Sequence, residues 1–237
     1  MNAPLHIAFY NHSKLIKDTD CAFQVEAIGE QLREHAAPFW GDPPPGCTFF
    51  GSVPKVPPGQ AAILGYVDDD GNADSAGYHS EIGGLVYGLI DCGQSDVPSE
   101  TASHEGAEMY GNQHLTRKVS GPNKLLYFVE LGDPLQGRAY TIKVVLFGEE
   151  RHIVMADFCL PAWFGLPNAD GSSHRTYLGA IGAEYDPKPF EIMPGGYQIA
   201  ETATGKIQFL SSSGFSMRPS KHTRTHRILQ AARKQTA

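Results

Sequence analysis

The sequence of 237 residues lacks any long hydrophobic run. A membrane-spanning helix needs about twenty consecutive apolar residues, and no stretch of this chain approaches that length, so we expect no membrane partner. The segment Met1–Tyr10 has neither the charged start nor the long apolar stretch of a secretory signal. We therefore predict that the chain has no signal peptide and is cytoplasmic or virion-associated.

Closely spaced cysteines are also missing. The chain has four cysteines, at positions 21, 47, 92 and 159, and no CxxC pair. This spacing excludes a zinc knuckle and a CxxC redox centre. It favours four reduced, buried or partly buried thiols.

Acidic residues are absent from the last part of the chain. The net charge is −7, yet Lys and Arg are the only fully charged side chains from Met217 onward. The rest of the chain is therefore more acidic than its total suggests. A basic tail over residues 211–237 is typical of segments that dock onto nucleic acid, acidic surfaces or assembly partners, and equally of solubilising ends.

The remaining composition is that of a globular protein with one core. Hydrophobic residues make up 41% and charged residues 19% of the sequence. Apolar periodicity predicts a helix from Asp20 to near His35, an irregular proline-rich passage after Pro38, and loops over residues 165–196. Short apolar runs predict strands at Leu5–Tyr10, Thr48–Gly51, Ala61–Val67, Leu85–Ile90, Leu125–Leu131, Tyr140–Phe147 and His152–Phe158.

A second predicted helix contains the pattern HExxExxGxxH, from His104 to His114. Asp96 is a candidate N-cap for this helix, and Pro98 suits its first turn. Residues four apart lie on one face of a helix, so His104 and Glu108 are predicted to face a common ion. We expect Gly111 to end the helix in the left-handed conformation, which would turn His114 back toward that ion.

These residue types favour a metal site. His104, Glu108 and His114 are the predicted ligands, and Glu105 is the predicted general base that takes a proton from water. Zn²⁺ is the expected ion, although two histidines and a carboxylate also suit iron(II), and carboxylate-rich sites admit manganese or calcium. The alternative is a helix whose polar side chains are simply solvated.

The pattern resembles the HExxHxxGxxH motif of metzincin metallopeptidases, with Glu108 at the second histidine position. The resemblance implies an α+β, zincin-like fold. It implies an N-terminal lobe at 1–114, with a mixed sheet and two main helices and ending in the metal-ligand helix. A smaller, mostly β and irregular C-terminal lobe would cover 115–210, with the active cleft between the lobes.

The chain also resembles a zincin-like family of bacterial and bacteriophage proteins that have an SHExxE helix followed by E-x-x-D-P and D-F-x-x-P blocks. Where that family tends to place Asp-Pro after the helix, this chain has Asn112-Gln113. The ion is therefore completed either by His114 or by other residues near it. The segments that carry the resemblance are residues 39–41, 77–79, 102–108, 128–134, 156–164 and 194–197, and the alternative ligands or neighbours of the ion are His79, Glu130, Asp133, Asp157 and Tyr197.

Met193 and Tyr197 are candidates for two further features of a metallopeptidase site. Met193 is a candidate for the methionine turn beneath a metzincin metal, although methionine is also a common core filler. Tyr197 is a candidate hydroxyl donor to a developing oxyanion.

The sequence thus favours a zinc-dependent metallopeptidase, a hydrolase with a variant HExxE site and a peptide or protein substrate. Leu85–Ile90 is the predicted edge strand that pairs with an extended peptide. The alternative is a bacteriophage virion protein on the same scaffold whose catalysis has lapsed, with the basic tail as the element that binds virion or assembly partners.

Overall fold

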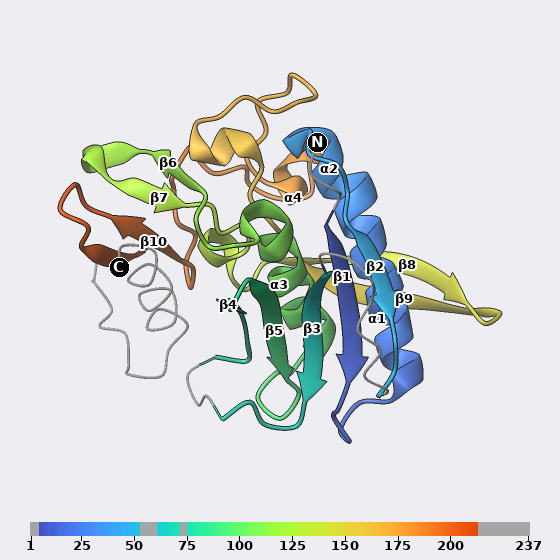
Figure 1. Ribbon diagram of the computed structural model, residues 1–237. Coiled ribbons are helices and arrows are strands. Elements are labelled where there is room, and N and C mark those ends of the chain that lie inside the picture. The colour runs from blue at the N-terminus through green and yellow to red at the C-terminus, as the bar shows by residue number, and fades with distance from the viewer. Residues whose placement is uncertain (1–4, 53–60, 72–74, 213–237) are drawn as a thin grey trace.

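A five-stranded mixed sheet forms the N-terminal half of the protein (Figure 1). The computed structural model describes residues 5–52, 61–71 and 75–212. The strand order is β2-β1-β3-β5-β4, and all neighbours are parallel except β4 and β5. The strands are β1 (His6–Asn11), β2 (Gly46–Phe49), β3 (Ala61–Val67), β4 (Gly77–Ile82) and β5 (Leu85–Asp91).

The central strands of this sheet were the most predictable, because strands of a parallel sheet are buried and read as continuous apolar runs. The bounds predicted for Ala61–Val67 are those of β3. The predicted edge strand was wrong. Residues 85–90 belong to β5, which lies between β3 and β4, so the edge strand is β4. Gly83 and Gly84 both adopt positive φ and join β4 to β5 in a tight hairpin.

The first helix is longer than predicted. It begins as α1 (Asp18–Glu30), continues through a π-helical segment (Gln31–Ala36) and ends as α2 (Ala37–Trp40) before Gly41, whose φ is +72°. The predicted end near His35 was therefore wrong. Pro38 lies at the start of α2, directly after the π-helical segment.

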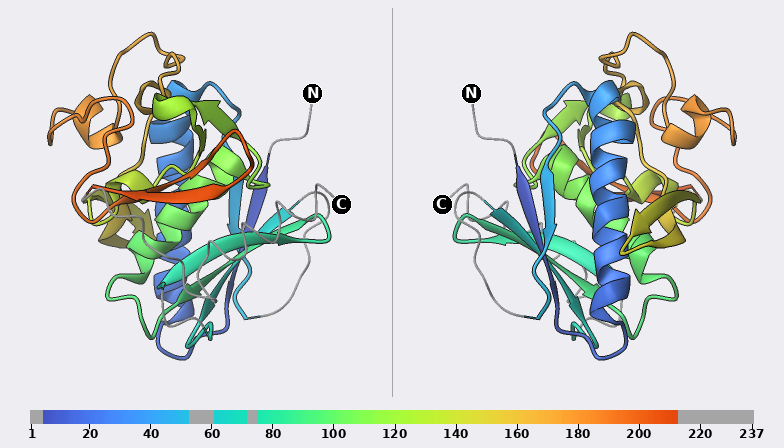
Figure 2. Two further views of the ribbon diagram at one scale, coloured as in Figure 1. Left: turned by 90° about the vertical axis from the view of Figure 1, so that its left-hand side faces the viewer. Right: turned by 90° about the vertical axis from the view of Figure 1, so that its right-hand side faces the viewer.

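The second long helix is α3 (Pro98–Asn112). Pro98 lies in its first turn, as predicted, but Val97 is the capping residue, so the assignment of Asp96 as N-cap was wrong. The helices α1 and α3 contact each other and cover the same face of the sheet (Figure 2). A side chain at Gly88 of β5 would collide with the Tyr78 carbonyl and Met109, so this glycine lets α3 approach the sheet.

The C-terminal half contains shorter strands. The four-stranded sheet has the order β11-β10-β7-β6, and β8 pairs with β9 alone. The sequence predicted parts of β7, β8 and β9 but not β6, β10 or β11. The elements are β6 (Lys118–Ser120), β7 (Leu126–Phe128), β8 (Ala139–Leu146), β9 (Glu149–Ala156), α4 (Tyr177–Ala180), β10 (Tyr197–Glu201), β11 (Ile207–Ser211) and 3-10 turns at Pro122–Lys124, Asp133–Leu135 and Pro161–Phe164.

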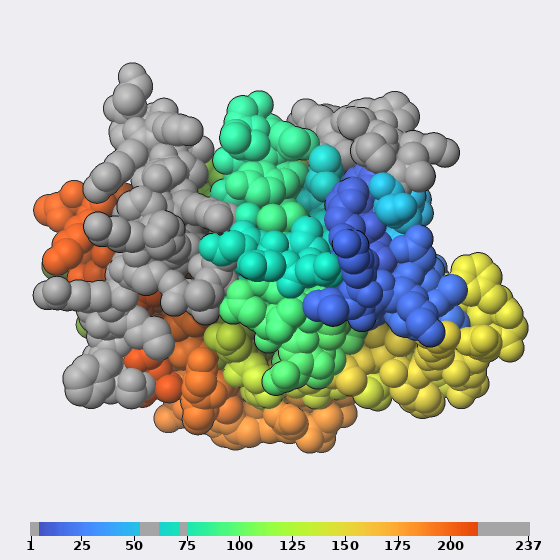
Figure 3. Space-filling model, turned by 90° about the horizontal axis from the view of Figure 1, so that it is seen from below, coloured from blue at the N-terminus to red at the C-terminus, as the bar shows by residue number. Residues whose placement is uncertain are grey.

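The hairpin β8–β9 packs against the N-terminal half. Both of its strands contact α1, β9 also contacts α3, and the hairpin extends past the N-terminal segments (Figure 3). One hydrophobic core runs from Ile7 in β1 to Phe164, and it includes Trp163, which is fully buried. The segments 1–114 and 115–210 therefore share a core.

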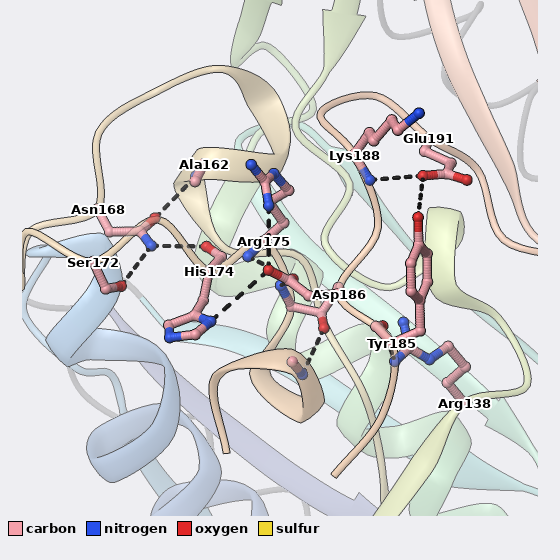
Figure 4. A network of polar contacts seen from close by, with 12 residues as sticks. Arg138, Ala162, Asn168, Ser172, His174, Arg175, Tyr185, Asp186, Lys188 and Glu191 are labelled. Carbon is pink, nitrogen blue, oxygen red and sulfur yellow. Dashed lines mark hydrogen bonds and ion pairs between the residues drawn. The ribbon is translucent and has the colours of Figure 1, made fainter. Parts of the chain in front are cut away.

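Polar contacts order the long loop between β9 and β10 (Figure 4). Asp186 accepts hydrogen bonds from the backbone N–H groups of Arg175 (2.9 Å) and Thr176 (3.2 Å). Asn168 accepts from the N–H of Ala162 (2.9 Å) and donates to the His174 carbonyl (2.8 Å). These bonds replace the ladders of regular structure, so a segment with little periodicity still has a defined path.

The mixed α+β class is confirmed, and the four cysteines are free thiols. Within the residues that the structure describes, no helix is long and apolar enough to span a membrane. Of the predicted basic tail at 211–237, residues 213–237 lie outside the described residues.

Candidate metal centre

Helix α3 places His104, Glu105 and Glu108 in the interior of the protein. Glu105 and Glu108 are buried, and the side chain of His104 is 14% exposed. Ser103 fixes the helix against β9, because its hydroxyl donates to the Glu100 carbonyl (2.9 Å) and accepts from the N–H of Ala156 (2.8 Å). Because both carboxylates are buried, they lie in a region of lower dielectric than water.

Two groups of residues could hold a metal ion, and the first comprises His104, Glu108 and Asp133. His104 Nε2 lies 3.1 Å from Glu108 Oε1 and 3.2 Å from Asp133 Oδ1. Asp133 begins a 3-10 turn after β7, and Gly132 precedes it. A Cβ at Gly132 would overlap the imidazole ring of His104, so only glycine allows this close approach.

The second group comprises His79, Glu105 and Glu108. His79 is buried in the edge strand β4, and its Nδ1 lies 3.3 Å from Glu105 Oε2 and 3.5 Å from Glu108 Oε2. Glu108 belongs to both groups. The antiparallel strand β4 and the helix α3 thus bring together residues more than twenty positions apart.

These distances fit a bound cation. Two ligands about 2.0–2.1 Å from a tetrahedral zinc ion lie roughly 3.3 Å from each other. The separations in the first group are 3.1 and 3.2 Å, and those in the second are 3.3 and 3.5 Å. In each group one imidazole nitrogen faces two carboxylate oxygens. One imidazole N–H can form a well-aligned hydrogen bond with only one of these two oxygens, whereas a cation can bind both oxygens.

A further buried carboxylate, Glu130, interacts electrostatically with Asp133 of the first group. Glu130 is buried and accepts a hydrogen bond from Asn112 Nδ2 (3.2 Å). Burial, followed by the charge of Asp133, raises the pKa of Glu130 well above its ordinary value. Burial also raises the pKa of Asp133, against the opposing effect of its hydrogen bond with His104. Both shifts reflect the cost of buried negative charge, which a cation would offset.

Tyr197 is hydrogen-bonded to Asp133. Burial, followed by the charge of Asp133, raises the pKa of the Tyr197 phenol well above its ordinary value, so this residue is a hydroxyl donor at neutral pH. It therefore orients Asp133. The neighbouring Met193 donates its N–H to the Pro134 carbonyl (2.9 Å), which holds the Met193–Gly196 turn against the Asp133 turn.

His114, the predicted third ligand, lies elsewhere. It is exposed, and its Nδ1 is 2.8 Å from Glu81 Oε2. The predicted role of Gly111 was wrong, since α3 continues to Asn112 and Gly111 is not among the residues with positive φ. A Cβ at Gly111 would overlap the side chain of Leu131, so this glycine serves packing. Because the helix does not reverse there, the first group has Asp133 in the position predicted for His114.

Asp157 is also separate from the two groups within the described chain. Its Oδ1 accepts from the N–H groups of Phe158 (2.9 Å) and Leu178 (3.1 Å), and its Oδ2 lies 3.6 Å from Arg138. These contacts fix the loop after β9. Asp157 is therefore a structural carboxylate.

Two other features of the described chain are weaker candidates for a site. Asp69, Asp70 and Asp91 form an acidic group near the surface, without a histidine. A hollow of about 690 Å³ near α1, β8 and α4 is lined in part by His35, Tyr140 and Tyr177. None of the residues of the two metal-binding groups lines this hollow.

Sequence reasoning named His79 and Asp133 only as alternatives. The sequence places Asp133 in the predicted turn Gly132-Asp133-Pro134 and His79 shortly before Gly83-Gly84, but it does not bring either residue to α3. Comparisons of this chain with protein-family models, with curated proteins and with solved structures found no match.

Proposed function

We propose that this protein is a metal-dependent hydrolase with a zincin-like fold that cleaves peptide bonds. The observation that carries the proposal is the group His104–Glu108–Asp133, in which one imidazole and two carboxylates converge beside the carboxylate of Glu105. Three protein ligands leave coordination positions for water and substrate, as in catalytic zinc sites.

The element order supports the zincin-like scaffold. A strand and a helix open the chain, further strands follow, and the helix with the HExxE motif comes next, before a half with shorter strands and long loops. This is the order that the resemblance to metzincins implies. Residues 77–79 and 128–134, which also resemble the zincin-like family, supply His79, Glu130 and Asp133 to the centre.

The chemistry divides between the ion and Glu105. A divalent cation held by His104, Glu108 and Asp133 would polarise a peptide carbonyl and acidify a water molecule. Glu105 is next to His104 on α3 and takes the proton from that water. Tyr197, which is neutral and bonded to Asp133, keeps the carboxylate oriented.

The edge strand β4 suits an extended substrate. It is paired with β5 on one side, and its other side is the edge of the five-stranded sheet. A peptide that adds to this edge forms main-chain hydrogen bonds with β4. Because His79 of β4 belongs to the centre, such a peptide would pass close to the metal-binding groups.

The test is turnover of a fluorescently labelled unfolded protein by the full chain carrying one equivalent of Zn²⁺. Glu105→Gln removes the proton acceptor, and we expect turnover to fall about 10²–10⁴-fold. Zinc content at one equivalent should stay unchanged, because Glu105 is not a ligand of the first group.

Glu150→Gln is the matched control, since it makes the same chemical change at an exposed carboxylate that pairs with Lys143 on the β8–β9 hairpin. We expect this variant to retain wild-type turnover. Equal turnover by wild type and Glu105→Gln, or no turnover by the zinc-loaded wild type, would contradict the proposed function.

A further inference from the structure

Glu108 lies between two histidines and faces each with a different oxygen. Its Oε1 is 3.1 Å from His104 Nε2, and its Oε2 is 3.5 Å from His79 Nδ1. The side chain is fully buried, at 0% exposure. A carboxylate whose two oxygens face two sets of ligands has the geometry of a bridging ligand in a two-metal site, in which the ions are about 3.5–4 Å apart.

The two groups offer equivalent donors. Each has one imidazole nitrogen and two carboxylate oxygens, and within each the atoms lie within 4.8 Å of one another. The donors gather as two groups that share Glu108, rather than as one group around a single point. Each group therefore satisfies the ligand requirement of a divalent cation separately.

Charge favours two ions over one. The cluster contains four buried carboxylates, Glu105, Glu108, Glu130 and Asp133, and two imidazoles. Metal-ligating imidazoles are neutral, so one divalent cation does not compensate the three carboxylates that belong to the two groups. Uncompensated charge in the interior is strongly destabilising. A second divalent cation compensates the remaining carboxylate charge.

We propose that His79, Glu105 and Glu108 form a second cation site, which shares Glu108 with the first site and makes the centre dinuclear. The proposal rests on the proposed function in that the first ion is bound by His104, Glu108 and Asp133. It also gives Glu105 two roles that exclude each other. A carboxylate oxygen that binds the second ion cannot accept a proton from water, so loading of the second site lowers turnover.

The first test is zinc stoichiometry, measured by equilibrium dialysis and elemental analysis of the full chain. We expect two Zn²⁺ per wild-type chain and one per His79→Gln chain. His114→Gln is the matched control, because it makes the same change at an exposed histidine outside both groups, and it should bind two. Saturation of wild type at one ion, or two ions in His79→Gln, would overturn the second site.

The second test needs no substitution and so does not depend on the folding of a variant. Wild-type chain loaded with Mn²⁺ should give the electron paramagnetic resonance spectrum of an exchange-coupled pair, because a shared carboxylate holds the two ions about 3.5–4 Å apart. A spectrum of isolated Mn²⁺ ions at full loading would overturn the bridging role of Glu108.

The activity measurement separates this inference from the proposed function. Wild-type turnover should rise to one equivalent of zinc and fall as the second equivalent binds. Turnover that falls in this way supports the second site. Two bound ions without hydrolysis at any loading would contradict the proposed function and support the dinuclear centre. Hydrolysis by a chain that saturates at one ion would support the proposed function and overturn the dinuclear centre.

Discussion

Asp157 illustrates how burial acts on a single residue. Its carboxylate is buried beside the backbone of Phe158 and Leu178, and Arg138 lies 3.6 Å away. Burial raises the pKa of Asp157 from 3.8 to about 6, against the opposing effects of the two backbone N–H donors and Arg138. The folded protein therefore binds the proton of this carboxyl group more tightly than the unfolded chain does.

This raised pKa predicts a pH dependence of stability. The stabilisation from the protonated carboxyl is fully present below about pH 4 and is lost as the pH rises through about 6, which amounts to about 2–3 kcal/mol. Asp157→Asn does not titrate. We therefore expect the free energy of unfolding of wild type, minus that of the variant, to fall by this amount between pH 4 and pH 7.

Urea denaturation followed by circular dichroism at both pH values measures that difference. Asp170→Asn is the control, because Asp170 is exposed and makes only a local bond to the Ser172 N–H. A difference between wild type and Asp157→Asn that is the same at pH 4 and pH 7 would contradict the role of burial.

His104 gives a second prediction at the scale of one residue. Its Nε2 lies within 3.2 Å of oxygens from Glu108 and Asp133, so it is the only imidazole of the first group. We expect His104→Ala to lose zinc from the first group, measured as metal content after purification without chelator. His114→Ala should retain wild-type zinc content, and equal content in His104→Ala and wild type would remove His104 from the ligand set.

At the scale of elements, glycines within the two long helices have different roles. A Cβ at Gly29 of α1 would meet only Cys47 Cβ, at an ordinary 3.6 Å. A Cβ at Gly111 of α3 would overlap Leu131, which is fully buried. Local helix propensity favours alanine at both positions, but the packing of α3 opposes it at one.

We therefore expect Gly29→Ala to raise the free energy of unfolding by about 0.5–1 kcal/mol, because alanine has the higher helix propensity. Gly111→Ala should lower it by about 1–3 kcal/mol, because Leu131 must leave its rotamer. Chemical denaturation of both variants measures these opposite signs. Stabilisation by Gly111→Ala of the same size would show that the core around Leu131 relaxes freely.

At the scale of the whole molecule, the candidate metal centre joins distant parts of the chain. The candidate ligands come from β4, from α3 and from the turn that follows β7. An ion bound there connects the five-stranded sheet with the C-terminal half. The unfolded chain does not preserve this arrangement, so binding energy adds to the stability of the folded state.

Metal removal should consequently lower the melting temperature. A ligand present at 100 times its dissociation constant stabilises the native state by about 2.7 kcal/mol, which corresponds to roughly 5–11 °C for a chain of this size. Calorimetry of zinc-loaded and chelator-treated protein measures the shift. Because apo protein also carries uncompensated carboxylates, an unchanged melting temperature would contradict metal binding at this centre.

The local features of this protein follow from its amino-acid sequence. The apolar run at Ala61–Val67 fixes β3, because a strand buried on both faces needs continuous apolar side chains. The spacing of His104, Glu105 and Glu108 fixes their position on one side of α3, because helix geometry sets it. The α+β class follows from the order of such elements.

Tertiary structure alone decided which residues complete the candidate site. His79 and Glu105 are 26 positions apart, and His104 and Asp133 are 29 apart, so no local pattern specifies these contacts. The antiparallel pairing of β4 with β5 places His79 next to α3. The absence of a side chain at Gly132 leaves room for the imidazole ring of His104. His114 was favoured by spacing but pairs with Glu81, because α3 runs on through Gly111 and packing against Leu131 keeps that glycine helical.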